Sequence, residues 1–198
     1  AAGSTDILAR STANVLGKEL GQSFVVENRP GASGNIGAET VAKAAPDGYT
    51  LLFTTTNLTM NPALSKSLPY DAVADFAPVT MVAFAPMVLM KAPQVEGASL
   101  RELLAVIKAR PKQFNFSSSG VGGAPHIAGE LFRMAGALDM VHVPYNDAAP
   151  ALNDVAAGRV QLTFTTFTSA QGLLKGNRVV PVAVASRNRL PSLPEVPT

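Results

Sequence analysis

Few side chains in this chain of 198 residues could carry out covalent or acid–base chemistry. The chain contains no Cys, which excludes thiol nucleophiles, disulfides and Cys-ligated zinc. Its histidines, His126 and His142, lie sixteen residues apart, with no HExxH motif or acidic cluster that would give them metal-ligand spacing. Ser118 and His126 could form a pair, but no third group is evident to orient the histidine. We therefore expect no metal, no cofactor and no catalytic site.

Two segments that precede expected helices have the residue types of an anion-binding loop. They are residues 1–6 (AAGSTD) and residues 117–126 (SSSGVGGAPH). The unpaired N–H groups and the dipole of a helix N-terminus favour an anion, while Ser and Thr add donors and Gly lets the backbone approach closely. For either segment alone, simple N-capping is at least as good an interpretation.

Phosphate fits these loops poorly. The chain has no Gly-Lys-Ser or Gly-Lys-Thr, as a P-loop requires, and Gly120, Gly122 and Pro125 give GxGxxP, which lacks the third glycine of a dinucleotide turn. Two small loops of N–H groups and hydroxyls suit a small carboxylate better.

Strands and helices must position these loops, and the hydrophobic pattern predicts that the two alternate. This alternation indicates the α/β class with mainly parallel sheets and flanking helices, and the pattern restarts near residues 84–98, which indicates two lobes. Helices are expected at 6–20, 34–45, 99–110, 124–136, 149–158 and 169–176; strands are expected at 23–28, 49–55, 114–118, 140–144, 160–164 and 179–187.

Composition argues against several other classes of protein. Charged residues make up 15% of the chain, the net charge is +2, and Lys and Arg are scattered, so we expect no nucleic-acid partner. No apolar run is long enough to span a bilayer, so no direct membrane insertion is expected. The chain starts without Met or a signal peptide and stops in a Pro-rich loop. We expect a segment, truncated at both ends, of a longer exported protein.

Several motifs follow one another in a recognisable order: GSTDILAR, VVENRPGASGNIGAETVAKAAPDGYTLLF, SSSGVGGAPHIAGELF, VPYNDAAPALNDVAAGRVQLTF and LPSLPEVPT. In order and spacing they resemble the Bug family, the extracytoplasmic solute-binding proteins of tripartite tricarboxylate transporters (TTT). The resemblance covers nearly the whole chain. Its most specific part is NRPGASGNIG followed by APDGYTLL.

The resemblance implies a two-lobed periplasmic-binding-protein fold that closes on its ligand like a flytrap. By analogy the first lobe comprises residues 1–85 and 182–198 and is incomplete, and the second comprises residues 86–181. Members of the family usually bind small carboxylates and deliver them to a membrane permease. The implied protein is periplasmic, captures a mono-, di- or tricarboxylate, aromatic ones included, and has the permease subunits of a TTT system as partners.

The resemblance also implies a set of ligand-binding residues. Two departures from the family pattern change the charges at the far end of the pocket: Tyr145-Asn146-Asp147 replaces the common Tyr-Lys-Gly, and Thr165 stands where an acidic residue commonly follows Phe164. The implied residues are Gly3, Ser4, Thr5 and Asp6 in the first loop, Ser118, Ser119, Gly120, Val121, Gly122 and His126 in the second, and Thr56, Asn57, Tyr145 and Thr165 around them.

Two other functions stay open at the level of sequence. A ligand-sensing domain in signalling or regulation would use the same fold, and an adjoining DNA-binding or membrane segment would identify it. A Ser/His-dependent hydrolase is less favoured, and it would turn over a substrate that a binding protein leaves unchanged.

Overall fold

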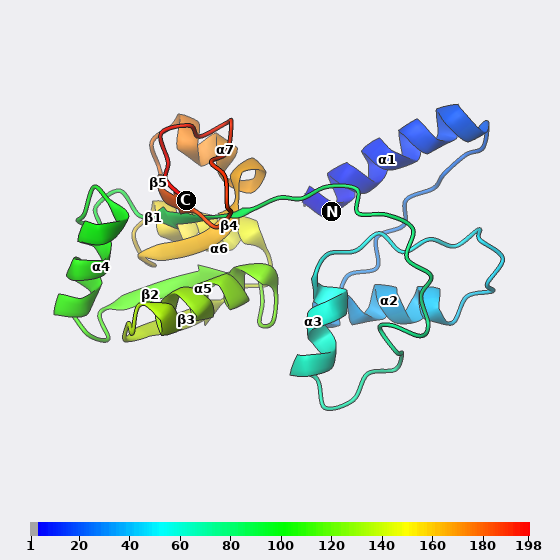
Figure 1. The fold of residues 1–198 in the computed structure, drawn as a ribbon, viewed down its shortest axis with the longest axis horizontal. Coiled ribbons are helices and arrows are strands. Elements are labelled where there is room, and N and C mark those ends of the chain that lie inside the picture. The colour runs from blue at the N-terminus through cyan, green and yellow to red at the C-terminus, as the bar shows by residue number, and fades with distance from the viewer. Residues whose placement is uncertain (1–3) are drawn as a thin grey trace. The chain divides into compact units, whose positions relative to one another are not determined.

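The computed structural model describes residues 4–198, and the contacts of the chain divide it into two compact units, Ala1–Phe84 and Ala85–Thr198. Each unit is described by itself. Within residues 4–84 the first unit contains three α-helices and a short 3-10 helix, joined by long extended segments (Figure 1). Its elements are α1 (Ser4–Leu20), η1 (Ala32–Gly34), α2 (Asn35–Ala42) and α3 (Asn57–Leu64).

The strands expected at 23–28 and 49–55 are not formed, so that expectation was wrong. Both segments are extended, but neither takes part in a β-ladder in the part of the chain that the structure describes. A strand is stabilised by hydrogen bonds and side-chain contacts with a neighbouring strand, not by its own propensity alone. Without such a neighbour, Val25 is 90% exposed and Tyr49 is 92% exposed.

The turn at residues 31–35 joins the helices of the first unit. Gly31 and Gly34 have φ of 120° and 90°, values that favour glycine. Asn35 at the start of α2 accepts two hydrogen bonds through Oδ1, from Asn61 Nδ2 at 2.5 Å and from the Tyr70 hydroxyl at 2.6 Å. The NRPGASGNIG motif therefore ties α2 to α3 and to the segment after it.

The second unit is built on a five-stranded sheet with the order β3-β2-β4-β1-β5. Parallel pairs join β2 to β3 and to β4, whereas β1 is antiparallel to both β4 and β5, so four of the five strands run in one direction. This agrees with the predicted α/β class. The strands are β1 (Met87–Lys91), β2 (Phe114–Ser118), β3 (Met140–Pro144), β4 (Leu162–Thr166) and β5 (Val180–Val184).

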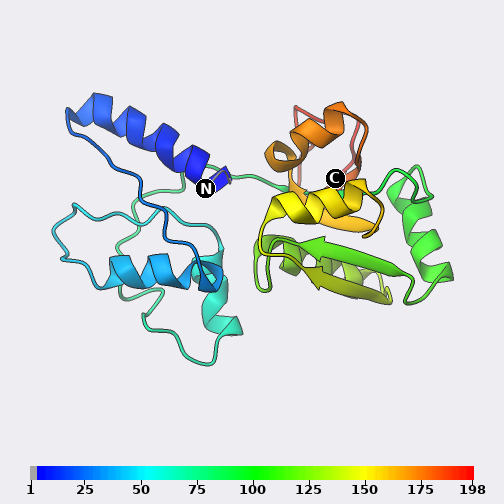
Figure 2. The ribbon, with the colours of Figure 1, turned by 180° about the vertical axis from the view of Figure 1, so that it is seen from behind.

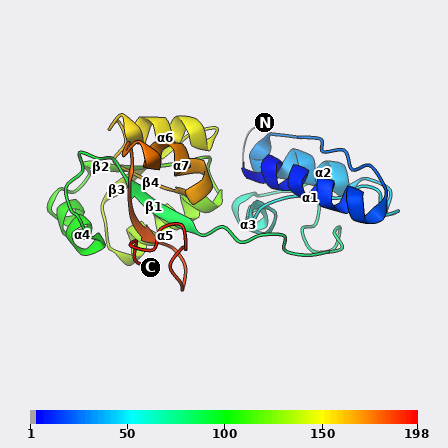
Figure 3. The ribbon, with the colours of Figure 1, turned by 90° about the horizontal axis from the view of Figure 1, so that it is seen from above.

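Helices cover both faces of this sheet. The chain moves outward from β2 to β3 and then back past β2 to β4. Because parallel crossovers are right-handed, the two connecting helices must lie on opposite faces, and Figure 3 shows α6 on one side of the strands and α5 on the other. The helices are α4 (Leu100–Ala109), α5 (Ala124–Ala135), α6 (Ala148–Ala156) and α7 (Phe167–Lys175).

The core of the second unit is centred on the inner strands. Phe116 on β2 and Leu162 on β4 are fully buried, as are Leu103 and Ile107 on the inner face of α4. Ser99 caps α4 by accepting a hydrogen bond from the Glu102 N–H, as the capping-box pattern predicts.

Residues 182–198 pack against the second unit in this structure. β5 pairs with β1, the Val184 N–H donates to the Pro197 carbonyl at 2.7 Å, and Val196 is buried in the core. The lobes expected from the resemblance, 1–85 with 182–198 and 86–181, stay a prediction about the longer protein.

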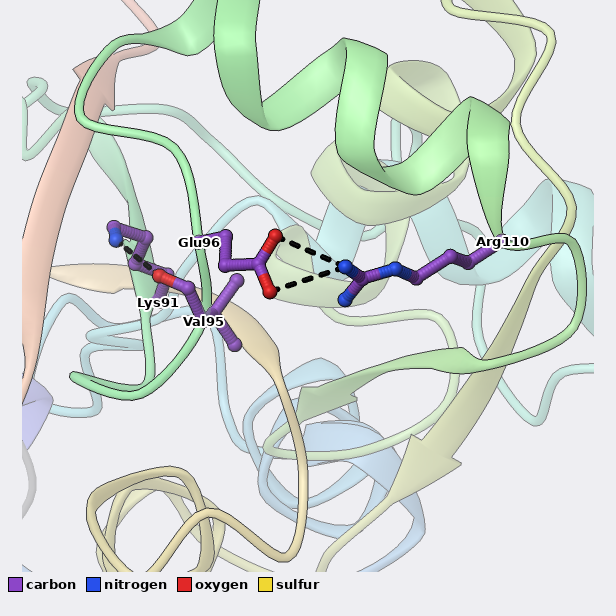
Figure 4. Close-up of polar contacts among 4 residues, drawn as sticks. All are labelled: Lys91, Val95, Glu96 and Arg110. Atoms are coloured by element: carbon purple, nitrogen blue, oxygen red, sulfur yellow. Dashed lines mark hydrogen bonds and ion pairs between the residues drawn. The ribbon is translucent and has the colours of Figure 1, made fainter.

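A buried lysine ends β1 (Figure 4). Lys91 is 7% exposed, its Nζ donates to the Val95 carbonyl at 2.5 Å, and burial lowers the pKa of its ammonium group. Nearby, Arg110 donates to both carboxylate oxygens of Glu96, at 3.0 and 2.9 Å. Both of these side chains are well exposed, so the ion pair contributes little stability.

We predict opposite effects for alanine at two helical glycines. A Cβ at Gly129 of α5 would lie 2.2 Å from the buried ring of Phe116, whereas a Cβ at Gly172 of α7 would meet nothing within 4 Å. Gly129→Ala should lower the free energy of unfolding by about 1–3 kcal/mol through overpacking. Gly172→Ala, the matched control, should raise it by up to about 1 kcal/mol through helix propensity.

Urea unfolding followed by circular dichroism measures both effects. Equal stabilities for the two variants would contradict the close packing of α5 on β2.

Candidate ligand-binding site

The loop between β2 and α5 has the form expected of an anion-binding loop. It leaves the sheet at Ser118 and enters α5 at Ala124, with Pro125 in the first helical turn where its missing N–H costs nothing. Gly120 and Gly122 have φ of 136° and 80°, which side chains with a Cβ rarely adopt. The two glycines therefore set the course of the backbone.

The Ser118 hydroxyl organises the start of this loop. Ser118 is 1% exposed, and its Oγ lies 3.0 Å from the Gly120 carbonyl, to which it donates, and 3.3 Å from the Gly120 N–H, from which it accepts. A third partner is His142 Nε2, at 2.7 Å. Because the hydroxyl has one proton, already donated to Gly120, His142 is the donor in this arrangement and carries its proton on Nε2.

His142 is the partner of Ser118 that sequence reasoning missed. The sequence suggested Ser118 with His126 as the conceivable pair. Parallel pairing of β2 with β3 places His142 opposite Phe116, and the two rings stack with centroids 4.9 Å apart. The alignment of residues 114–118 with 140–144 as neighbouring strands is the signal that could have found it. Figure 2 shows these strands side by side.

Burial holds His142 in its neutral form. It lowers the pKa of the imidazole from 6.5 to about 4, with a second contribution from His126. The ring of His126 stacks on that of His142 with centroids 4.1 Å apart, so a charge on one disfavours a charge on the other.

His126 contacts the loop from the first turn of α5. Its Nδ1 accepts a hydrogen bond from the Gly122 N–H at 3.0 Å, and Gly122 is buried. When neutral, His126 therefore carries its proton on Nε2. Among the other loop residues proposed from sequence, Ser119 is half-buried and Val121 is exposed.

Tyr145 reaches this loop through its backbone. Its N–H donates to the Ser118 carbonyl at 3.0 Å, but its hydroxyl donates to Asp154 of α6 at 2.6 Å. Burial and this bond raise the pKa of the Tyr145 hydroxyl to about 12. Asp147, one of the departures from the family pattern, caps α6 through a bond from the Ala148 N–H. Thr165 is buried in β4 opposite Val88.

The first proposed loop belongs to α1. Gly3 lies outside the described residues, while Ser4, Thr5 and Asp6 begin the helix. Asp6 accepts from Asn28 Nδ2 at 2.7 Å and pairs with Arg10 at 3.0 Å, and these bonds lower the pKa of its carboxyl group. This carboxylate therefore ties α1 to the segment that follows it.

The remaining proposed residues of the first unit lie at the start of α3. Asn57 Nδ2 donates to the Ser33 carbonyl at 3.2 Å, and the Thr56 carbonyl accepts from the Thr59 hydroxyl at 2.9 Å. Asp6 and Asn57 thus have separate sets of partners within this unit.

Residues 4–198 contain neither a metal-binding cluster nor a helix that could span a membrane. No cluster of three or more His, Cys, Asp or Glu side chains there could hold a metal ion. No helix in the same range has both the length and the apolar character needed to cross a membrane.

Comparison with known proteins decides the family. The model of the tripartite tricarboxylate transporter family receptor (TctC) matches residues 8–198. The chain belongs to this family. It is 36% identical over 198 residues to protein BugT of Bordetella pertussis, covering 99% of this chain and 61% of that protein. It is 35% identical over 196 residues to the UPF0065 protein in the tcbD-tcbE intergenic region of Pseudomonas sp. strain P51, covering 99% and 58%.

Solved structures of TctC and Bug proteins share the fold. Rpa4515 of R. palustris, solved with adipate, gives a TM-score of 0.92 at 36% identity and covers 99% of this chain and 66% of that one. The periplasmic binding protein BugD gives a TM-score of 0.88 at 33% identity and covers 100% of this chain and 66% of that one. MatC from Rhodopseudomonas palustris, with bound malate, gives a TM-score of 0.84 at 28% identity and covers 100% of this chain and 68% of that one.

These matches confirm the predicted Bug family and the periplasmic-binding-protein fold. The family and its solved members are binding proteins for transport and not enzymes, in agreement with the expectation drawn from the sequence. The chain spans 58% and 61% of the length of the two curated relatives named above.

We predict that His142 titrates far below an ordinary histidine. Its pKa is lowered from 6.5 to about 4 in the folded protein, so between these values the unfolded chain binds more protons. The free energy of unfolding should therefore fall as the pH drops from about 6.5 towards about 4.

NMR titration of the imidazole signals gives the midpoint directly. Urea unfolding at several pH values should show a shallower fall for His142→Gln than for the wild type, because the glutamine cannot titrate. A His142 midpoint near 6.5 would contradict its partial burial beside Ser118 and Phe116.

Proposed function

We propose that the protein to which this chain belongs is an extracytoplasmic solute-binding protein for small carboxylates. It captures the ligand between two lobes in the periplasm and delivers it to the membrane permease of a TTT system. The observation that carries the proposal is the β2–α5 loop, with its left-handed glycines at the start of a helix, in a chain of the receptor family. Adipate and malate, held by two structures of similar fold, are both dicarboxylates.

The β2–α5 loop offers an anionic ligand uncharged hydrogen-bond donors. Residues 119–123, between β2 and α5, contain no ionisable side chain, so the donors available there are backbone N–H groups and the Ser119 hydroxyl. Hydrogen bonds to a charged group are each worth about 1.5–3 kcal/mol. A few such bonds, with the dipole of α5, suffice for micromolar binding of a small carboxylate.

The residues that we propose to contact the ligand are given for each unit by itself. In the second unit they are Ser118, Ser119, Gly120, Val121, Gly122 and His126, with Tyr145 and Thr165 nearby in sequence or sheet; in the first unit they are Ser4, Thr5, Asp6, Thr56 and Asn57.

We predict that binding depends on the charge of the ligand. Adipate or malate should raise the melting temperature of the full-length protein, because a ligand that binds only the folded state stabilises it by mass action. Adipamide, which has the length of adipate but neutral amide ends, should not. Thermal shift followed by calorimetry measures both. Equal binding of adipate and adipamide, or turnover of a bound ester, would contradict the proposal.

We predict that alanine at Gly120 weakens carboxylate binding at least about tenfold. The added Cβ has room, since its nearest neighbour would be the Tyr145 carbonyl at 3.9 Å, but φ of 136° strains any residue with a side chain. The loop should therefore relax out of its ligand-binding shape.

Gly48→Ala is the matched control. Its φ is 82° and its Cβ would meet nothing within 4 Å, so the variant also places a Cβ at a positive φ, but outside the proposed site. Calorimetry should show normal affinity for Gly48→Ala. Normal affinity for Gly120→Ala as well would remove the β2–α5 loop from the site.

A further inference from the structure

One backbone donor of the β2–α5 loop is bonded to an imidazole. The Gly122 N–H, which the proposed function would direct to a carboxylate, donates to His126 Nδ1 at 3.0 Å. Gly122 is buried, so leaving this N–H without a partner would be costly. A nitrogen that accepts a hydrogen bond has no proton, so the bond requires neutral His126. A protonated ring would turn Nδ1–H toward the Gly122 N–H, donor against donor.

The surroundings of the stacked pair disfavour a charge on His142. His126 stacks on His142 at 4.1 Å, and His142 is fixed between Phe116 and the Ser118 hydroxyl. Burial disfavours a charge on His142, whose pKa is about 4. Two imidazoles at this separation do not both become charged near neutral pH.

Few other charges lie around the pair. On α5 itself, Glu130 is one helical turn beyond His126, and its carboxylate is paired with Arg133 at 2.8 Å. From β3 the ionisable group is His142, and β2 and residues 119–123 contribute none. β4 contributes no ionisable group, β1 ends in the buried Lys91, and Asp147, in the turn after β3, caps α6. A carboxylate bound at this loop would add a negative charge beside a protonated His126.

We propose that His126 couples carboxylate binding to the uptake of one proton. In its neutral form it occupies the Gly122 N–H and competes with the ligand. In its protonated form it releases that N–H to the carboxylate and adds a cation beside it. This inference rests on the proposed function, and it makes His126 a determinant of specificity for anions over neutral solutes. Because the complex binds more protons than the free protein, affinity must rise as the pH falls.

Calorimetry on the full-length protein with adipate or malate tests the coupling. Aliphatic carboxyl groups stay ionised from about pH 6.5 to about pH 8.5, where imidazoles titrate, so a change in affinity over this range reports on the protein. We expect the dissociation constant to increase with pH, by at most about tenfold per unit, which is the limit for one proton. Buffers with different ionisation enthalpies should reveal an uptake of up to about one proton per ligand.

His126→Gln is the decisive variant. The amide oxygen of glutamine can accept the Gly122 N–H, but the side chain cannot take up a proton. This variant should bind the carboxylate without taking up a proton, and its dissociation constant should not change with pH. His142→Gln removes the other imidazole of the stack. This variant should still take up a proton when it binds the carboxylate, even where its affinity for the carboxylate differs from that of the wild type.

The outcomes separate the two proposals. If the affinity of the wild type does not change with pH, or if His126→Gln still takes up a proton on binding, the proposed coupling is wrong. Either result would leave the proposed carboxylate-binding function unaffected. Failure of adipate, malate and other carboxylates to bind at any pH would overturn the proposed function itself, and the coupling with it.

Discussion

The parallel pairing of β2 with both β3 and β4 is the constraint on which the second unit depends. It buries Phe116 completely and ends β2 at Ser118, where the chain turns toward α5. Parallel register also brings His142 of β3 beside these residues. The right-handed crossovers then place α5 and α6 on opposite faces of the sheet. The position of the loop follows from this pairing, because the carboxyl end of a parallel strand faces the N-terminus of the helix that follows it.

Polar groups at the end of β2 satisfy one another. Ser118 bonds the two polar backbone groups of Gly120, His142 bonds Ser118, and His126 bonds the Gly122 N–H. A buried N–H without a partner costs about 1–3 kcal/mol, which gives the chain a reason to hold these donors internally. The same bonds must be exchanged if a carboxylate takes a donor. The affinity for a carboxylate then depends on the free-energy difference between the free loop and the ligand-bound loop, in both of which the polar groups are hydrogen-bonded. Protonation of a histidine can shift that difference.

The first unit shows the opposite situation. Its helices are tied by polar contacts, such as those of Asn35 with Asn61 and Tyr70, while the segments at 23–28 and 49–55 have no strand partner among the described residues. Apolar side chains that a sheet would bury, including Val25 and Val79, are exposed. Local propensity alone does not form a sheet, because each strand needs hydrogen bonds from a neighbour.

The sequence by itself determined the features that depend on local spacing. It predicted the helices of the second unit and the strands β2, β3, β4 and β5, but not β1. It also predicted the glycine-containing loop before α5, where Gly120 and Gly122 have positive φ. Its motif order was enough to identify the Bug family. Tertiary structure decided what depends on neighbours distant in the chain. It paired Ser118 with His142, turned the Tyr145 hydroxyl toward Asp154, and left two expected strands unpaired. The physical reason is that periodicity records which face of an element is buried, whereas strand order and register select which side chains meet.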